Sequence, residues 1–194
     1  ADSGHALRDV GVNSINISLD SLQAERFKAI TRIGDLNTVL RGIDRAVECG
    51  FERIRLNAVI LDGLNRDEVV PLTHYALERG IHIAFIEEMP LGQVNVGGKP
   101  LAYVSSDTLQ EELAEHFTLV PMTASDTAGP ARDFLIAGSQ TQVGFISPHS
   151  HNFCAQCNRL RISAEGRLLM CLGNEESIDL RGLLRTGSTD EEIK

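Results

Sequence analysis

The sequence has no run of about 18 consecutive apolar residues, the length a helix needs to cross a bilayer, so a membrane-spanning protein is not indicated. Basic residues are in the minority: 18 Lys and Arg stand against 27 Asp and Glu, giving a formal net charge of −9. They form no block, so binding to nucleic acid as the main task is disfavoured. No leader of charged, then apolar, then small residues opens the chain, so we expect a cytoplasmic protein.

Cysteine is also scarce, and four cysteines in such a chain suggest metal or redox chemistry before disulfides. The first residues lack a Met start and read as the end of a helix that Gly11 closes, so we expect a piece of a longer chain. What is present is an ordinary globular composition, with 194 residues of which 42% are hydrophobic, enough for one medium domain or two small ones.

From Val12 onward the pattern predicts strands that alternate with helices. The expected strands lie at 14–20, 53–60 and 81–89. The helices between them should begin after Asp35 and at a capping box formed by Asn65 and Glu68, and should end at Gly50 and Gly80. This order implies parallel strands with right-handed crossovers, whose C-terminal ends gather on one rim.

Polar residues share one face of the first two strands. They are Asn16, Ser18 and Asp20 on the first strand and Arg55 and Asn57 on the second. A closed eight-stranded barrel fills its interior with apolar layers, so this pattern favours part of an open or wide barrel that holds a polar ligand. The alternative is a sheet covered on one side only, with these residues in solvent.

The segment 92–101 is rich in Gly and interrupts the alternation, which predicts a boundary between domains at 1–91 and 98–194. Helices are expected at 105–116 and 180–184, and strands at 117–122, 134–137, 142–147, 160–163 and 167–172. The last two strands should form a hairpin around the turn 164–166.

Cys154, Cys157 and Cys171 are spaced C-x2-C-x13-C, with the third Cys on the far arm of that hairpin. Three thiolates suit a four-iron cluster with one open iron, or a zinc site completed by His149 or His151. The alternative to a metal site is that two of these thiols are merely buried. Cys49, on a helix, is expected to be an inert packed thiol.

Arg159 and Arg161 are two residues apart on a predicted strand and therefore share a face beside these cysteines. Guanidinium groups suit phosphate or the acceptor edge of guanine, so an anionic ligand near the metal is suggested. The alternative is a pair of surface arginines that offset nearby acidic residues.

Four segments together resemble the MoaA family, the radical-SAM GTP 3′,8-cyclases of molybdenum cofactor biosynthesis. They are NISLDSL at 16–22, RLNAVI at 55–60, FIEEMPLG at 85–92 and FCAQCNRLRISAEGRLLMCL at 153–172. The resemblance implies an α/β fold, with part of a radical-SAM (partial TIM-type) parallel βα barrel followed by a smaller α+β C-terminal domain. The family's N-terminal C-x3-C-x2-C loop, which binds the SAM-cleaving [4Fe-4S] cluster, and its Gly-Gly tail are not in this sequence.

The resemblance also implies roles for individual residues. Ser18 and Met89 correspond to contacts to S-adenosylmethionine, and Arg55 stands where the family has a Lys that contacts GTP. Arg keeps the positive charge and changes its geometry. The three C-terminal cysteines would ligate an auxiliary [4Fe-4S] cluster whose open iron meets the purine of GTP. Arg159, Leu160 and Arg161 would line the same pocket.

The implied reaction converts GTP to (8S)-3′,8-cyclo-7,8-dihydroguanosine 5′-triphosphate, which cyclic pyranopterin monophosphate synthase takes up downstream. The catalytic residues stay unassigned, a homodimer is compatible with the resemblance, and these 194 residues alone are expected to be inactive. Two other functions stay open: another radical-SAM enzyme with an auxiliary cluster, such as a peptide or cofactor maturase, and a non-catalytic Cys/His zinc module.

Overall fold

The computed structural model describes residues 3–89, 95–96, 99–100, 102–123, 130–151, 157, 160–171 and 176–193. It divides into two compact units. The first is Ala1–Glu88 with Val94–Asn152, and the second is Met89–Gln93 with Phe153–Lys194. Each unit is described by itself.

The first unit is built on a six-stranded sheet in the order β1-β2-β3-β8-β7-β6. The strands are β1 (Ser14–Ser18), β2 (Arg53–Ile60), β3 (His82–Glu87), β8 (Gln142–Ile146), β7 (Ala131–Ile136) and β6 (Leu119–Pro121). The pairs from β1 to β8 are parallel, and β8, β7 and β6 are antiparallel. The parallel strands and their connecting helices confirm the α/β class, and the fold is a partial barrel with a C-terminal domain.

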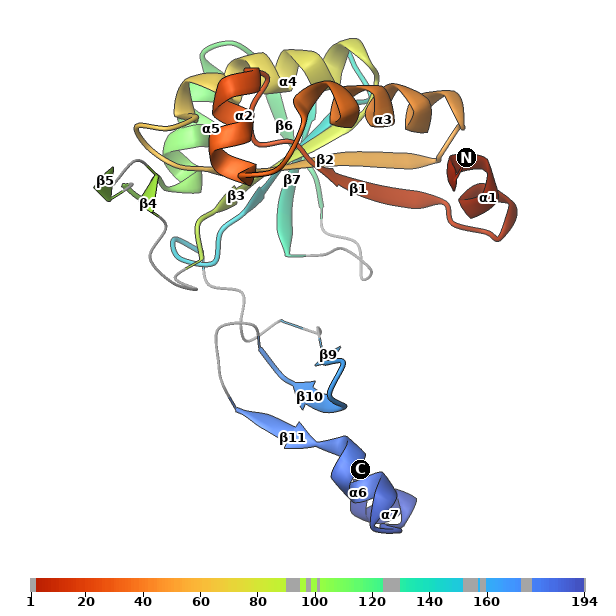
Figure 1. Cartoon of the computed structure of the whole chain (residues 1–194). Helices are drawn as coiled ribbons and strands as arrows, with labels where there is room; N and C mark the ends of the chain where they lie inside the picture. The colour runs from red at the N-terminus through yellow and green to blue at the C-terminus, as the bar shows by residue number, and fades with distance from the viewer. Residues whose placement is uncertain are drawn as a thin grey trace. The chain divides into compact units, whose positions relative to one another are not determined.

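Helices cover one face of this sheet (Figure 1). The helical segments are α1 (Ser3–Asp9), α2 (Ala24–Thr31), α3 (Leu36–Glu48), the 3₁₀ turn η1 (Arg66–Glu68), α4 (Val69–Glu78) and α5 (Ser106–Ala114). A separate two-stranded ribbon consists of β4 (Asn95–Val96) and β5 (Lys99–Pro100). Among the described residues, no helix is both long and apolar enough to cross a membrane.

The core lies between the sheet and helices α2 to α5, because alternate strand residues point toward the helices. Its fully buried side chains include Ile43, Leu56, Ile83, Phe85 and Phe145. Each contributes about 1.5–3 kcal/mol relative to an exposed side chain, so this layer holds the unit together. The opposite sheet face, which these helices leave uncovered, is called the open face below.

Most helix ends follow the sequence signals. Asp35 Oδ1 accepts a hydrogen bond from the Thr38 amide at 2.7 Å and caps α3, as predicted. Gly50 follows the same helix with a φ of 69°, a conformation that glycine adopts without strain. Ser105 caps α5 in the same way, accepting from the Thr108 amide at 3.2 Å.

The predicted capping box at Asn65 and Glu68 is wrong. Helix α4 begins only at Val69, after η1, and neither side chain caps a helix. Both are buried and bind the ends of β1 and β2 instead, because tertiary hydrogen bonds satisfy them better than a local cap.

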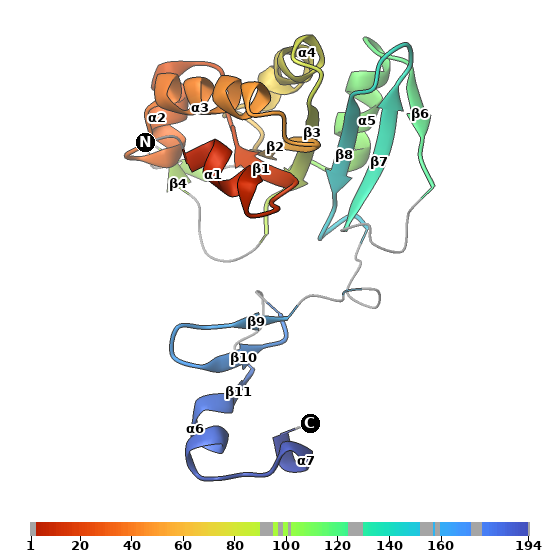
Figure 2. The ribbon, with the colours of Figure 1, turned by 90° about the vertical axis from the view of Figure 1, so that its right-hand side faces the viewer.

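The second unit is a small three-stranded antiparallel sheet (Figure 2). Its elements are β9 (Arg161–Ile162), β10 (Arg167–Leu169), β11 (Ser177–Asp179), α6 (Leu180–Arg185) and α7 (Asp190–Ile193). Gly166 has a φ of 78° in the turn between β9 and β10, which confirms the predicted hairpin.

The predicted domain boundary stays a prediction. Strands on both sides of 92–101 belong to one sheet, since β3 pairs with β8. The contact-based units therefore divide the chain differently from the expected domains at 1–91 and 98–194.

Candidate functional site

One row of residues crosses the open face from β1 to β7. The strand registers align Ser18, Asn57, Ala84, Gly144 and Asp133. The middle of the row has the two smallest side chains, and its ends are polar. We call these five residues the central row.

Arg55 lies over the middle of the central row and pairs with Asp133. Its Nη2 is 2.6 Å from Asp133 Oδ1, although two strands separate β2 from β7. A Cβ added to Gly144 would lie 2.5 Å from that Asp133 oxygen and 3.5 Å from Arg55 Nη1. The guanidinium therefore reaches across β3, and it can do so because the residue beneath it is glycine.

Two further groups surround this ion pair. Arg53 Nη2 is 3.8 Å from the other Asp133 oxygen, so two arginines face one carboxylate. His82 Nδ1 accepts a hydrogen bond from the Gln142 amide at 3.1 Å. Burial, with the charges of the two arginines, lowers the pKa of His82 to about 4, so its imidazole is neutral at pH 7.

Two buried polar atoms on the same face of β2, Arg55 Nε and Asn57 Oδ1, have no hydrogen-bond partner within the described segments of the chain. Buried polar atoms in folded proteins are nearly always satisfied, so an unmatched donor and acceptor mark a place for a ligand or water. Asn57 and Ser18 are direct partners in the β1–β2 register. The open face thus presents cationic and polar groups beside Ser18.

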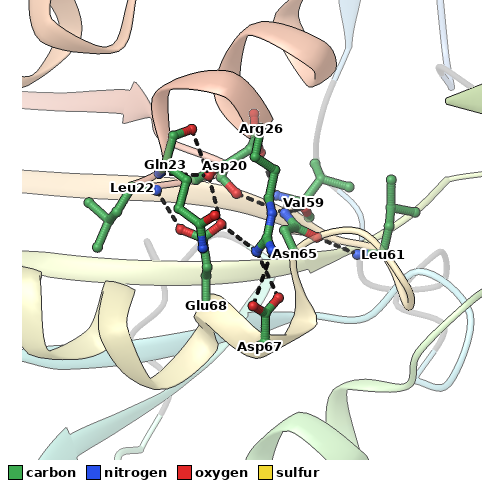
Figure 3. A network of polar contacts seen from close by, with 10 residues as sticks. Asp20, Leu22, Gln23, Arg26, Val59, Leu61, Asn65, Asp67 and Glu68 are labelled. Carbon is green, nitrogen blue, oxygen red and sulfur yellow. Dashed lines mark hydrogen bonds and ion pairs between the residues drawn. The ribbon is translucent and has the colours of Figure 1, made fainter. Parts of the chain in front are cut away.

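A hydrogen-bond network fixes the chain just beyond Ser18 (Figure 3). Asp20 Oδ1 accepts from the Val59 amide at 2.8 Å, and the Asn65 amide group donates to the carbonyls of Asp20 and Val59. Burial raises the pKa of Asp20, against the opposing effect of the Val59 hydrogen bond. These hydrogen bonds therefore hold the ends of β1 and β2 together next to Ser18, the predicted contact to S-adenosylmethionine.

Glu68 completes this network from the helix side. Its carboxylate accepts from the Ser21 hydroxyl at 2.7 Å and from the Leu22 amide at 2.6 Å. Arg26 bridges Glu68 and Asp67, with Nη1 at 2.7 Å from an oxygen of each (Figure 3). The segment after β1 is thus fixed by a charged cluster in which Glu68 is buried and Asp67 is exposed.

Glu87, at the end of β3, binds the turn at 147–151. Its carboxylate accepts from the amides of Ser106, His149 and Ser150 at 2.7 to 3.1 Å, and from the Ser150 hydroxyl. Burial alone would raise the pKa of Glu87, but these four hydrogen bonds outweigh it and lower the pKa to about 2. Sequence reasoning quoted Glu87 within its motif without assigning it a role.

The two histidines considered as zinc ligands have other partners. The ring of His149 packs against Tyr103 with centroids 5.1 Å apart, and His151 Nε2 is 2.9 Å from Asp107. Within the described part of the chain, no group of three or more His, Cys, Asp or Glu residues is placed to hold a metal ion. Cys154 and Arg159 lie outside the described residues.

The remaining predicted residues of the second unit lie on or next to the β9–β10 hairpin. Cys157, Leu160, Arg161 and Cys171 are exposed, and Met89 is half-buried. Arg161 pairs with Leu169, so the chain before β9 and the chain after β10 leave the hairpin at the same end. In the sequence, Cys157 precedes β9 and Cys171 follows β10, so the two cysteines flank that end of the hairpin. Cys49 is buried in the first unit, as expected.

Residues 5–76, which include the parallel strands β1 and β2, match the model of the Radical SAM superfamily, and this match gives the class of protein. Members of this class use iron–sulfur clusters and S-adenosylmethionine. Residues 81–194 match the model described as Molybdenum Cofactor Synthesis C, and the chain belongs to that family.

Curated relatives agree with this assignment. The chain is 56% identical over 180 residues to a GTP 3′,8-cyclase of Pseudomonas entomophila, covering 92% of this chain and 54% of that protein. It is 52% identical over 179 residues to the enzyme of Saccharophagus degradans, covering 92% and 54%. With the Ectopseudomonas mendocina enzyme it shares 50% identity over 192 residues, covering 99% and 58%. The chain thus spans a little over half the length of these relatives.

Proposed function

We propose that the chain is the GTP-binding part of a GTP 3′,8-cyclase and serves the conversion of GTP to (8S)-3′,8-cyclo-7,8-dihydroguanosine 5′-triphosphate. The observation that carries the proposal is the cysteine-flanked hairpin with Arg161 on its first strand, within a segment that matches the molybdenum cofactor synthesis family. The identity to named cyclases supports the same substrate.

Cofactors supply the radical chemistry when bound, namely hydrogen removal from the ribose of GTP by a 5′-deoxyadenosyl radical. This chain's own residues bind and orient. In our proposal Cys154, Cys157 and Cys171 hold the auxiliary [4Fe-4S] cluster, and Ser18 and Met89 contact S-adenosylmethionine.

The proposed substrate contacts rest on the resemblance to the family. Arg55 provides a guanidinium for the triphosphate, and Arg159, Leu160 and Arg161 line the purine end. Precise holding of the ribose against the purine is the protein's main contribution to such a ring closure. A cytoplasmic location, a homodimer and transfer of the product to cyclic pyranopterin monophosphate synthase complete the proposal.

The direct test is GTP binding by calorimetry under anaerobic conditions, after reconstitution with iron and sulfide. Arg161→Ala should weaken binding about tenfold or more, because a charge-assisted hydrogen bond contributes about 1.5–3 kcal/mol. Arg185→Ala, an exposed arginine on α6 in the same unit, is the matched control and should bind as the parent does. Equal GTP affinity in both variants would reject the proposed role of Arg161.

A further inference from the structure

Asp133 holds Arg55 by one hydrogen bond, which occupies one of the three guanidinium nitrogens. Among the residues that the structure describes, only Nη2 donates a hydrogen bond, while Nε is buried without a partner. Carboxylates bind guanidinium groups most strongly through two parallel hydrogen bonds, so this pair is weaker than a bidentate pair. A second anion could therefore displace Asp133 or share the guanidinium with it.

The charges around Arg55 leave a net charge of +1. Arg53 and Arg55 supply two positive charges, Asp133 supplies one negative charge, and His82, beside them on β3, is neutral at pH 7. Arg55 and Asp133 have only 11% and 19% of their side chains exposed. Water screens charges poorly at such depth, so a single carboxylate strongly affects anion binding.

We propose that Asp133 competes with anionic ligands for Arg55 and thereby sets the affinity and charge selectivity of the open face. The inference rests on the proposed function only in taking the triphosphate of GTP as the natural ligand. Asp133 lies 78 residues from Arg55 in sequence, on a strand expected to begin only at residue 134, so local patterns gave no sign of the pair.

The test uses the 194-residue chain with orthophosphate, pyrophosphate and tripolyphosphate as probes in calorimetry at low salt. Asp133→Asn keeps an oxygen acceptor for Arg55 and removes the negative charge. The affinity of the Asp133→Asn variant for each probe should exceed that of the parent. The factor should grow with probe charge and reach about tenfold for tripolyphosphate. The gain should shrink as salt is raised, because ions screen the attraction. A purely structural effect would not follow probe charge.

Two further variants separate charge from shape. Asp133→Glu keeps the charge and should bind the probes as the parent does, while adding Arg55→Gln to Asp133→Asn should abolish the gain. Asp44→Asn is the matched control, because it removes a carboxylate paired with Arg79 on the helical side. Thermal unfolding confirms that each variant is folded.

The inference is overturned if Asp133→Asn binds tripolyphosphate no more tightly than the parent, or if Asp133→Glu shows the same gain. A charge-dependent gain for the probes, without any binding of GTP, would leave the inference standing and reject the proposed function. If instead the parent binds GTP, Arg161→Ala weakens that binding and Asp133→Asn shows no gain for the probes, the proposed function stands and the inference is rejected.

Discussion

At the residue scale, single polar side chains with partners far away in sequence organise the first unit. Asp133 reaches Arg55, and Glu87 joins the end of β3 to the turn at 147–151. Neither follows a periodic pattern, so neither role could be predicted from local sequence. The residues assigned from cysteine spacing and family resemblance, by contrast, could be named in advance, and their ligand contacts remain predictions.

Glu87 should make stability depend on pH. Its pKa is lowered from 4.5 to about 2 in the folded chain, so its stabilising effect is full above about pH 4.5 and declines as pH falls toward 2. Glu87→Gln should lower the free energy of unfolding by about 1–3 kcal/mol at pH 7, and by less at pH 3, where part of the stabilising effect of the carboxylate is lost. Urea unfolding at both pH values measures this difference.

Glu88→Gln is the control for Glu87, because the neighbouring carboxylate is half-buried and has no hydrogen bond assigned among the described residues. It should change stability little at either pH. A loss in Glu87→Gln that is equally large at pH 7 and pH 3 would show that its carboxylate charge is not what binds the turn.

At the element scale, strands and helices were largely predictable, because hydrophobic periodicity and end signals are local. Strand β2 and the cap at Asp35 are confirmed. The exception is Asn65, whose sequence context resembles a cap while its side chain joins three backbone groups of the β1 and β2 ends. Local spacing cannot distinguish these roles, because one of the partners, the Asp20 carbonyl, is 45 residues away in the sequence.

The different roles of Asp35 and Asn65 predict different losses of unfolding free energy when each is replaced by Ala. Asp35→Ala should cost about 1 kcal/mol of unfolding free energy, the usual value for a lost helix cap. Asn65→Ala should cost about 2–4 kcal/mol, since it leaves the Leu61 amide and two carbonyl groups without their partner in a buried place. Urea denaturation of both variants tests this. Equal losses of about 1 kcal/mol would mean that Asn65 acts as a simple cap.

At the scale of the whole molecule, the α/β class and the family were predictable because the motifs are specific and occur in order along the chain. The extent of the sheet was not. Strands β8, β7 and β6 extend it beyond the expected boundary, since β3 pairs with β8 across an interval whose described residues form one helix, α5, and four other strands, β4 to β7. Such long-range pairing depends on the packing of the entire sheet, which no window of sequence contains.

The central claim is that these residues bind GTP beside an iron–sulfur cluster held by the cysteine hairpin. The most direct measurement is anaerobic GTP calorimetry on the chain with and without reconstituted iron and sulfide, alongside Cys157→Ala as a form that should hold little iron. The account predicts tight GTP binding only in the iron-loaded parent, with affinity at least about tenfold lower in the other forms, a difference of about 1.4 kcal/mol or more. GTP affinity that is the same with and without iron, or a parent chain that takes up zinc in place of iron, would contradict it.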